Sequence, residues 1–378
     1  MNGEEVEMGG RKQANSFQII FFLSLAIIST ALVVNASTGK SPLEKSLSAF
    51  PILMYDSDIG LGYGGKAKFV NYLSRKESLD AIVFNSSKGE RWYVLTFSIP
   101  DTEVRQGTRY ELSLDIKAEY NKYLKYYFYG TGADSQKSDE TQFIYERKEL
   151  QFSLARGFTE HLVMELHYLL KNVHYFEIQR NQAFSELLET VGEQFSPYAS
   201  LVLRYDTSDS RIHPKKGSSI LFQGDLAAEF LGNKNASFYR LTVEVRKFLP
   251  LFGKKDILAF RGLIQKIGGS EIPLFEMPAL GGGSTLTAMR GFKMNRFTDK
   301  GKWLFNAEYR FPLWKKLGGN LYMDSGAVWP SFSEIDLGHT KIDAGWGLRY
   351  YLENFVVRFD MGVSQEGTGI YFNFGHIF

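Results

Sequence analysis

The chain has 378 residues, and its 44 basic and 42 acidic side chains leave a formal net charge of only +2. This balance excludes the strongly basic surface that nucleic-acid binding requires, so no nucleic-acid partner is expected. Cysteine is absent and the six histidines show no ligand spacing, which predicts no disulfide, no metal site and no cofactor. Aromatic residues make up 15% of the chain and glycine occurs 36 times, a composition typical of membrane β-barrels.

The N-terminal region carries an export pattern. An uncharged, largely apolar run at residues 17–34 follows two basic residues and ends in small side chains at Ala36. Signal peptides have this order of basic, apolar and small residues before their cleavage site. We therefore expect residues 1–36 to be a signal peptide, with an uncleaved membrane anchor as the alternative. Residues 37–50 are then a short periplasmic segment before a barrel formed by residues 51–378.

From residue 51 onward, short segments recur in which apolar and polar side chains alternate. Successive side chains of a strand point to opposite faces, so each segment is a ribbon with one apolar and one polar surface. There are about 16 such segments, an even number as bacterial single-chain barrels require. They lie at about 51–56, 60–71, 79–88, 91–99, 108–120, 141–156, 160–174, 196–206, 216–230, 236–249, 255–268, 302–313, 318–329, 340–352, 354–364 and 368–378.

The connection lengths favour a membrane barrel over a soluble sandwich, in which strands also alternate. If both termini lie in the periplasm, most periplasmic connections are short, and three extracellular ones are long, at about 121–140, 175–195 and 269–301. Short periplasmic turns and long extracellular loops are typical of outer-membrane barrels. The predicted fold is therefore all-β, a transmembrane antiparallel β-barrel with a long sixth extracellular loop.

The turn between the eighth and ninth segments is rich in turn-forming residues. Asp206 and Asp209 can bond to nearby backbone, while Pro214 has a fixed φ and Gly217 tolerates positive φ. With His213, the two aspartates also resemble a catalytic cluster. Because all three lie in a predicted periplasmic turn, the turn interpretation is favoured, and no enzymatic activity is expected.

The sixth loop contains the most distinctive motif of the chain. A glycine-rich run is followed by Arg290, Gly291 and Phe292, and then by two ribbons that carry Glu308 and Asp324 among their polar positions. Glycine allows the backbone to fold back tightly. An arginine enclosed in a polar cavity needs carboxylate partners, and its planar fork suits them. The charged residues of both ribbons are therefore available to face Arg290.

The last segment ends in an aromatic residue. Phe372, Phe374 and Phe378 share one parity with Ile370. This arrangement looks like the C-terminal targeting signal that outer-membrane barrels present to their insertion machinery. The alternative is an ordinary terminal strand.

Taken together, the loop motif, the two acids and the turn at 206–217 resemble the outer-membrane assembly and translocation barrels of the BamA, TamA and FhaC type, also called bacterial surface antigens. The likeness extends from about residue 198 to the end. It implies that the sixth loop folds into the barrel lumen. It also implies that Arg290 contacts Asp324 as its main partner and Glu308 as a second.

The resemblance implies a function in inserting proteins into the outer membrane or moving them across it. Outer-membrane lipids, client outer-membrane proteins and a separate periplasmic partner would be the partners. A seam between the first strand, with Pro51, and the last, with Gly369 and Gly375, would be weak enough to open. The family's usual periplasmic POTRA domains do not fit into residues 37–50, a departure from its pattern. The alternatives are a passive pore or surface-structural protein and, with less support, a barrel enzyme.

Overall fold

The computed structural model describes residues 44–56, 60–179, 193–234, 236–251 and 255–378. The predicted signal peptide lies outside these residues. Strands dominate the described ranges, whose helical turns are all too short to traverse a bilayer. The single α-helical turn among them is α2 (Thr102–Arg105), between the fourth and fifth strands.

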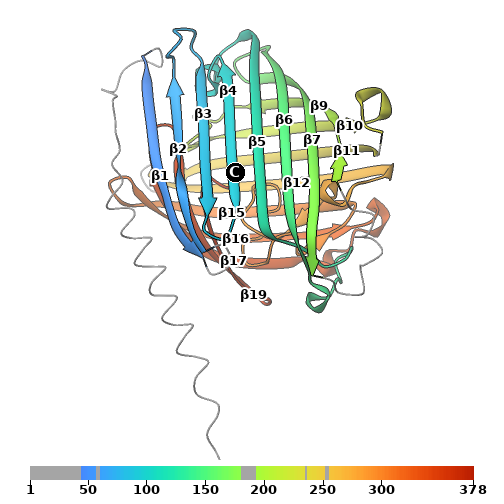
Figure 1. Cartoon of the computed structure of the whole chain (residues 1–378). Helices are drawn as coiled ribbons and strands as arrows, with labels where there is room; N and C mark the ends of the chain where they lie inside the picture. Colours follow the sequence, from blue (N-terminus) through green and yellow to red (C-terminus); the bar gives the residue numbers. More distant parts are fainter. Residues whose placement is uncertain (1–43, 57–59, 180–192, 235, 252–254) are drawn as a thin grey trace, which may run out of the picture.

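One antiparallel sheet forms the wall of the molecule, and its long strands pair in chain order (Figure 1). Within the described residues these long strands number sixteen, and the three-residue β8 (Glu193–Phe195) adds a short strip beside β7. The predicted all-β fold with about 16 strands is thus confirmed. The sixteen strands are β1 (Ser46–Asp56), β2 (Gly60–Val70), β3 (Ser78–Ser86), β4 (Arg91–Ile99), β5 (Tyr110–Phe128), β6 (Thr141–Gly157), β7 (Leu162–Gln179), β9 (Tyr198–Asp206), β10 (Gly217–Ala227), β11 (Ser237–Leu251), β12 (Asp256–Glu271), β15 (Gly301–Trp314), β16 (Leu317–Trp329), β17 (Lys341–Tyr351), β18 (Val356–Ser364) and β19 (Gly367–Phe374).

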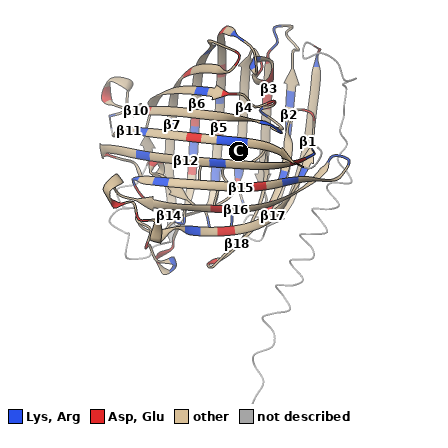
Figure 2. Cartoon of the chain, turned by 180° about the vertical axis from the view of Figure 1, so that it is seen from behind, with Lys and Arg blue, Asp and Glu red and all other residues tan. Residues whose placement is uncertain are grey.

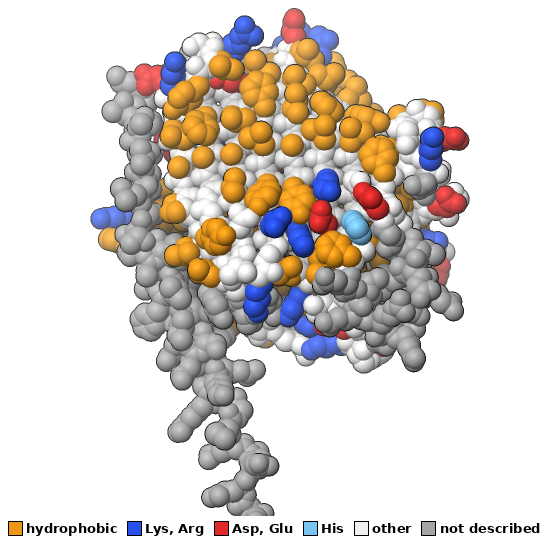
Figure 3. All heavy atoms as spheres, in the orientation of Figure 1, with side chains coloured by type: hydrophobic (Ala, Val, Ile, Leu, Met, Phe, Trp, Pro, Cys, Tyr) orange, Lys and Arg blue, Asp and Glu red, His pale blue; other side chains and the backbone are white. Residues whose placement is uncertain are grey.

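Several strands are longer than the sequence pattern predicts. β1 begins at Ser46, so residues 46–50 belong to the sheet and not to the expected periplasmic segment. β5, β6 and β7 have 19, 17 and 18 residues, whereas about 9–11 are enough to cross a membrane. In Figure 3, hydrophobic side chains cover the upper part of this wall, and charged side chains gather below them. The lower ends of β5–β7 therefore extend beyond the apolar belt. There, the alternation of apolar and polar side chains no longer indicates which side of the strand faces lipid.

The two faces of the wall differ in the sense expected of a membrane barrel. On β16, Leu321 and Met323 are exposed. Asn320, Tyr322 and Asp324, which alternate with them, are buried. A soluble sandwich would bury the apolar face and expose the polar one. The apolar outer face instead suits contact with lipid, and the polar face lines the lumen.

The two edges of the sheet overlap. Among the described residues, β1 forms its ladder with β2, and β19 forms its ladder with β18. The Phe374 ring lies 6.2 Å from that of Phe50, and the ammonium group of Lys66 lies 5.6 Å from the Phe374 ring. Phe50 is buried and stands opposite Lys66 on the lumen-facing side of β1 and β2. The end of β19 therefore packs against the inner face of β1 and β2.

The last four residues leave the wall, in contrast to the predicted strand at 368–378. β19 ends at Phe374, and Gly375 adopts a left-handed conformation with φ of 83° that redirects the chain. Phe378 is buried, its ring lies 6.4 Å from that of Phe248, and its main-chain oxygen accepts a 3.1 Å hydrogen bond from Arg310. Of the three predicted targeting residues, Phe372 and Phe374 lie at the overlapped edge and Phe378 lies in the lumen.

Candidate functional site

The sixth loop, residues 272–300, folds into the lumen and packs there. Leu280 and Phe292 from the loop share one buried cluster with Leu263 and Leu304 from the wall. Burial of these apolar side chains stabilises the inward position of the loop. Its short elements are η5 (Leu274–Glu276), β13 (Ala279–Leu280) and β14 (Phe297–Thr298), and the last two pair with each other.

Two glycines let the loop double back on itself. Gly281 and Gly282 have φ values of 117° and 93°, in the left-handed region that glycine adopts without strain. The amide of Gly282 donates to the main-chain oxygens of Met289 and Phe292, at 3.1 Å each. A Cβ on Gly281 would overlap the main-chain oxygen of Lys293. This reversal places Arg290 against the inner side of the wall at β15, β16 and β18.

Arg290 is fully buried and brings together the residues that the sequence indicates. Its Nε and Nη2 donate to the two carboxylate oxygens of Asp324, each at 2.8 Å. Its Nη1 donates to Glu308 at 2.6 Å. The guanidinium lies 3.3 Å from the centroid of the Tyr322 ring, a stacked cation–π contact. The fork of Arg290 therefore holds two acids from neighbouring strands, a geometry that lysine does not reproduce.

The register of β15 and β16 fixes the position of both acids. Asn306 stands opposite Asp324 and donates to it at 2.8 Å. Asn320 donates to Glu308 at 3.1 Å. Each carboxylate thus accepts from an amide of the opposite strand as well as from Arg290. Buried charges need several partners to offset their desolvation, and these bonds supply partners additional to Arg290.

The structure adds charged residues that the sequence analysis did not single out. Asp360 lies 3.5 Å from Arg290 and 2.8 Å from Arg349, and Arg310 lies 2.8 Å from Glu308. Figure 2 shows basic and acidic positions along β15 and β18. Alternation places these residues on polar faces, but it does not say which of them reach Arg290. The cluster is balanced, with four arginines and four acids: Arg290, Arg310, Arg349, Arg358, Glu308, Asp324, Asp343 and Asp360, all buried.

The rest of the motif binds the last two strands. The main-chain oxygen of Gly291 accepts from the hydroxyl of Ser364 on β18 at 2.7 Å. The main-chain oxygen of Phe292 accepts from the hydroxyl of Tyr371 on β19 at 2.9 Å. The Phe292 ring packs edge-on against Phe297 within the loop, with 5.4 Å between centroids. The loop tip therefore joins β15 and β16 to the final hairpin of the barrel, β18 and β19.

The turn between β9 and β10 contains the predicted turn-forming residues Asp206, Asp209, Pro214 and Gly217. Asp206 accepts from the amide of Ser208 at 2.9 Å, and Asp209 accepts from the amide of Lys215 at 2.8 Å. Gly217 has φ of 104°, which favours glycine at this position. The two carboxylates thus bond to the backbone of their own turn.

His213 connects this turn to two others. Its Nε2 lies 2.8 Å from the main-chain oxygen of Leu352, and its ring lies 5.3 Å from Tyr351 and 6.4 Å from His376. Burial lowers the pKa of His213, and Lys215 lowers it further, although the bond to Leu352 opposes the shift. The imidazole therefore packs between turns and the C-terminal residues.

An apolar outer face, a charged lumen and an inward loop held by a buried arginine define the class of outer-membrane β-barrels whose lumen is occupied by their own chain. A family model described as the Omp85 superfamily domain matches residues 75–378, and the chain belongs to this superfamily. Membership places it among the outer-membrane barrels that act in protein insertion and translocation in general. Comparison with curated proteins finds no match.

Solved structures share the fold at low sequence identity. BamA from Haemophilus ducreyi lacking POTRA domains 1–3 is 15% identical with a TM-score of 0.58, and the match covers 93% of this chain and 77% of that one. CdiB from Escherichia coli is 12% identical, with a TM-score of 0.59 and coverage of 89% and 62%. CdiB from Acinetobacter baumannii is 12% identical, with a TM-score of 0.52 and coverage of 87% and 59%. The chain thus spans about three-fifths of either CdiB chain.

Proposed function

We propose that this protein assists the insertion of client proteins into the outer membrane, or their passage across it, by parting the sheet between β1 and β19. A separate periplasmic protein would deliver the clients. The proposal rests on membership of the superfamily together with one observation, the overlap of the two sheet edges, where β1 forms its ladder with β2 and β19 with β18. Unpaired edge strands present backbone donors and acceptors to which a client strand can add.

Side chains hold the overlapped edges together. The Phe374 ring contacts Phe50 and Phe355, with centroids 6.2 and 5.8 Å apart. Asn354 in the turn before β18 donates to the hydroxyl of Ser48 on β1 at 2.7 Å. Parting a paired ladder in lipid would leave many backbone groups unsatisfied. Separating these rings and one hydrogen bond has a much smaller cost, which supports this place as the opening.

The Arg290 cluster would set the position of the movable edge. Gly369 on β19 lies so close to the loop that a Cβ there would overlap the main-chain oxygen of Arg290, and Gly362 on β18 is similarly close. Together with the Tyr371 bond, these contacts tie β19 to a loop that is anchored at Asp324. In this proposal the loop tip stays fixed at Asp324, and β19 moves relative to it.

A pair of disulfides tests the opening, since the chain contains no native cysteine to interfere. Ser48→Cys with Asn354→Cys bridges the seam, whereas Ser153→Cys with His167→Cys bridges β6 and β7, which already pair at that register. Both variants are reconstituted as full chains in liposomes and assayed for folding of a small outer-membrane barrel. We expect oxidation to abolish assistance only in the seam variant and reduction to restore it. Full assistance by a completely oxidised seam variant would refute the opening.

The alternative of a passive pore has less support, because the sixth loop and residues 375–378 occupy the lumen. Single-channel recording in planar bilayers separates the two functions. An assembly protein of this design should show at most brief, rare openings. A steady conductance, combined with no effect on client folding in the same liposomes, would favour the pore.

A further inference from the structure

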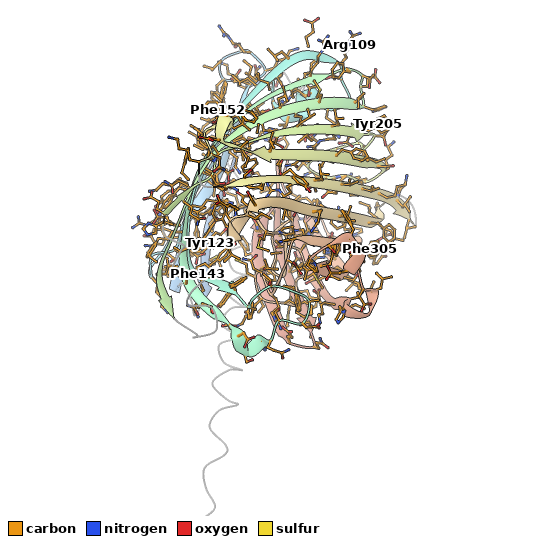
Figure 4. The ribbon with its side chains drawn as sticks, turned by 90° about the vertical axis from the view of Figure 1, so that its right-hand side faces the viewer. Arg109, Tyr123, Phe143, Phe152, Tyr205 and Phe305 are labelled. Atoms are coloured by element: carbon orange, nitrogen blue, oxygen red, sulfur yellow. The ribbon has the colours of Figure 1, made fainter. Side chains whose placement is uncertain are left out.

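A cavity of about 500 Å³ lies inside the barrel between the sixth loop and a wall that runs from β5 through β12 to β15. Tyr126 and Tyr145 line it on the wall side, and Leu286 and Thr287 line it on the loop side. In Figure 4, Tyr123, another lining residue, lies in the half of the molecule opposite Arg109. The cavity is separate from the Arg290 cluster, and its volume is in the range of small-molecule sites.

The charged side chains that line this cavity include more bases than acids, although Arg240 also pairs with Asp225 and Arg147 with Glu119, two acids that are not lining residues. Four cations line it, against two acids: Arg147, Lys171, Arg240 and Lys302, with Glu149 and Glu276. Lys171 and Arg240 share Glu276, each at 2.7 Å. Burial raises the pKa of Glu276, but these two cations outweigh it and hold that pKa below its ordinary value. The acid is therefore already committed to neighbours in the protein.

Lys302 has no such acid. Its Nζ donates to the main-chain oxygens of Ala279 at 3.1 Å and Leu286 at 2.6 Å, and no carboxylate in the described part of the chain pairs with it. Burial itself opposes a charge on Lys302, and the charged groups near it are the guanidinium groups of Arg261 and Arg240. A buried cation next to other cations is stabilised by an anion. The cavity therefore favours a negatively charged ligand beside Lys302.

The neutral polar groups of the lining favour a ligand rich in hydroxyl groups. Three glutamines line the cavity, and the side-chain amide nitrogen of each donates a hydrogen bond of 2.8–2.9 Å to a neighbour in the wall: Gln151, Gln223 and Gln265. Within the described ranges, their amide oxygens accept no hydrogen bond. The hydroxyl groups of Ser200 and Thr287 are buried without a hydrogen-bond partner, and Ser200 is only 4% exposed. Buried polar groups normally have partners, so these groups are placed to bond a ligand.

We propose that this cavity binds an acidic sugar. Its carboxylate or phosphate would lie beside Lys302, and its hydroxyl groups would donate to the glutamine amide oxygens and accept from Ser200 and Thr287. The phenol groups of Tyr126 and Tyr145, whose rings stack with centroids 4.4 Å apart, offer further hydroxyl partners on the wall. Two sources share this chemistry: free sugar acids and the acidic sugars of the outer-leaflet lipopolysaccharide.

Calorimetry on the full chain in detergent micelles tests the site. The probes are digalacturonic acid, its neutral methyl ester, and the core oligosaccharide released from lipopolysaccharide. We expect at least one acidic probe to bind and the neutral ester to bind about tenfold more weakly, because the ester lacks the charge. Tighter binding of the oligosaccharide identifies the lipid source, and tighter binding of the disaccharide identifies a free sugar acid.

Matched variants locate the binding. Lys302→Met should weaken the acidic probe about tenfold, whereas Lys300→Met, which changes an exposed lysine two residues away, should have no effect. If Lys302→Met fails to fold, Ser200→Ala decides, because removing a hydroxyl that has no partner leaves the fold intact. Ser200→Ala should weaken binding several-fold. Absence of binding by both acidic probes, equal binding of the ester, or unchanged affinity in the folded variants would overturn the proposal.

Discussion

Tyr371 on the last strand donates its hydroxyl to the main-chain oxygen of Phe292, 2.9 Å away at the tip of the sixth loop. This bond joins the β19 edge of the sheet to a loop whose arginine is held by Asp324 on β16. β16 and β19 are therefore connected in two ways. One connection runs through the neighbouring strands of the wall, and the other runs through the sixth loop inside the lumen. A displacement of the loop must be transmitted to β19.

Replacing Arg290 with alanine should strongly destabilise the barrel. Asp324 and Glu308 would remain buried without their main cation, and removing one partner of a buried ion pair costs about 3–5 kcal/mol. Urea unfolding of the detergent-solubilised protein measures the change. Arg246→Ala is the control, since Glu244 keeps its bond to Arg261, and it should cost less than about 1 kcal/mol. Equal stability of the two variants would count against the structural role of Arg290.

Tyr371→Phe should loosen β19 selectively. The substitution removes one hydroxyl and leaves the oxygen of Phe292 without its donor, a loss of about 1 kcal/mol. Hydrogen exchange followed by mass spectrometry should show faster exchange in residues 367–374 and little change elsewhere. Tyr309→Phe removes only a long contact of 3.4 Å to Asp256 and should leave the exchange pattern as in the unmodified protein. Unchanged exchange of β19 in Tyr371→Phe would contradict the coupling.

Gly369→Ala should be far more harmful than the same change in another strand. The new methyl group would overlap the main-chain oxygen of Arg290, and overpacking of this kind typically costs about 1–3 kcal/mol. A Cβ added to Gly262 on β12 would have no atom within 4 Å, so Gly262→Ala should be tolerated. Unfolding midpoints of the two variants give the comparison. Similar midpoints would mean that the loop does not press on β19.

Stability should fall on acidification, because two partly buried histidines, His213 and His376, lie close together at the C-terminal end of the chain. Burial, with the nearby Arg310 and Arg349, holds the pKa of His376 well below its ordinary value despite the opposing charge of Glu308, and burial also lowers the pKa of His213. Neutral imidazoles are thus favoured in the folded state. Their stabilisation is complete above the unfolded pKa of about 6.5 and is lost as the pH falls through the lowered folded values.

His376→Gln tests this pH dependence, because glutamine stays neutral at every pH. Unfolding midpoints measured at pH 7.5 and pH 5 should differ less in this variant than in the unmodified protein. His174→Gln is the matched control, because His174 is exposed on β7, and it should preserve the full pH dependence. A His376→Gln variant with an unaltered pH slope would show that another group is responsible.

Much of the wall follows from the sequence by local rules. Alternation of side chains is a property of the extended backbone itself, so the apolar and polar parities of β16 and β18 predict which face meets lipid. The turn at Asp206–Gly217 is equally local, since its carboxylates bond to amides a few residues away. The sixteen wall strands, and with them the antiparallel barrel architecture, were therefore predictable from the chain.

The family resemblance implied the inward loop and the contacts of Arg290 with Asp324 and Glu308, but the rest of the lumen was decided only by the tertiary structure. Alternation assigns Asp360 and Arg349 to a polar face, but their distance from Arg290 depends on barrel curvature and on the path of a 29-residue loop (272–300). The overlap of Phe374 with Phe50 brings together residues from opposite ends of the chain. The alternation of side chains along a strand is a local pattern. It carries no information about contacts between strands that are far apart in the sequence. Packing of the whole molecule decides which buried charges contact one another and how the edge strands β1 and β19 overlap.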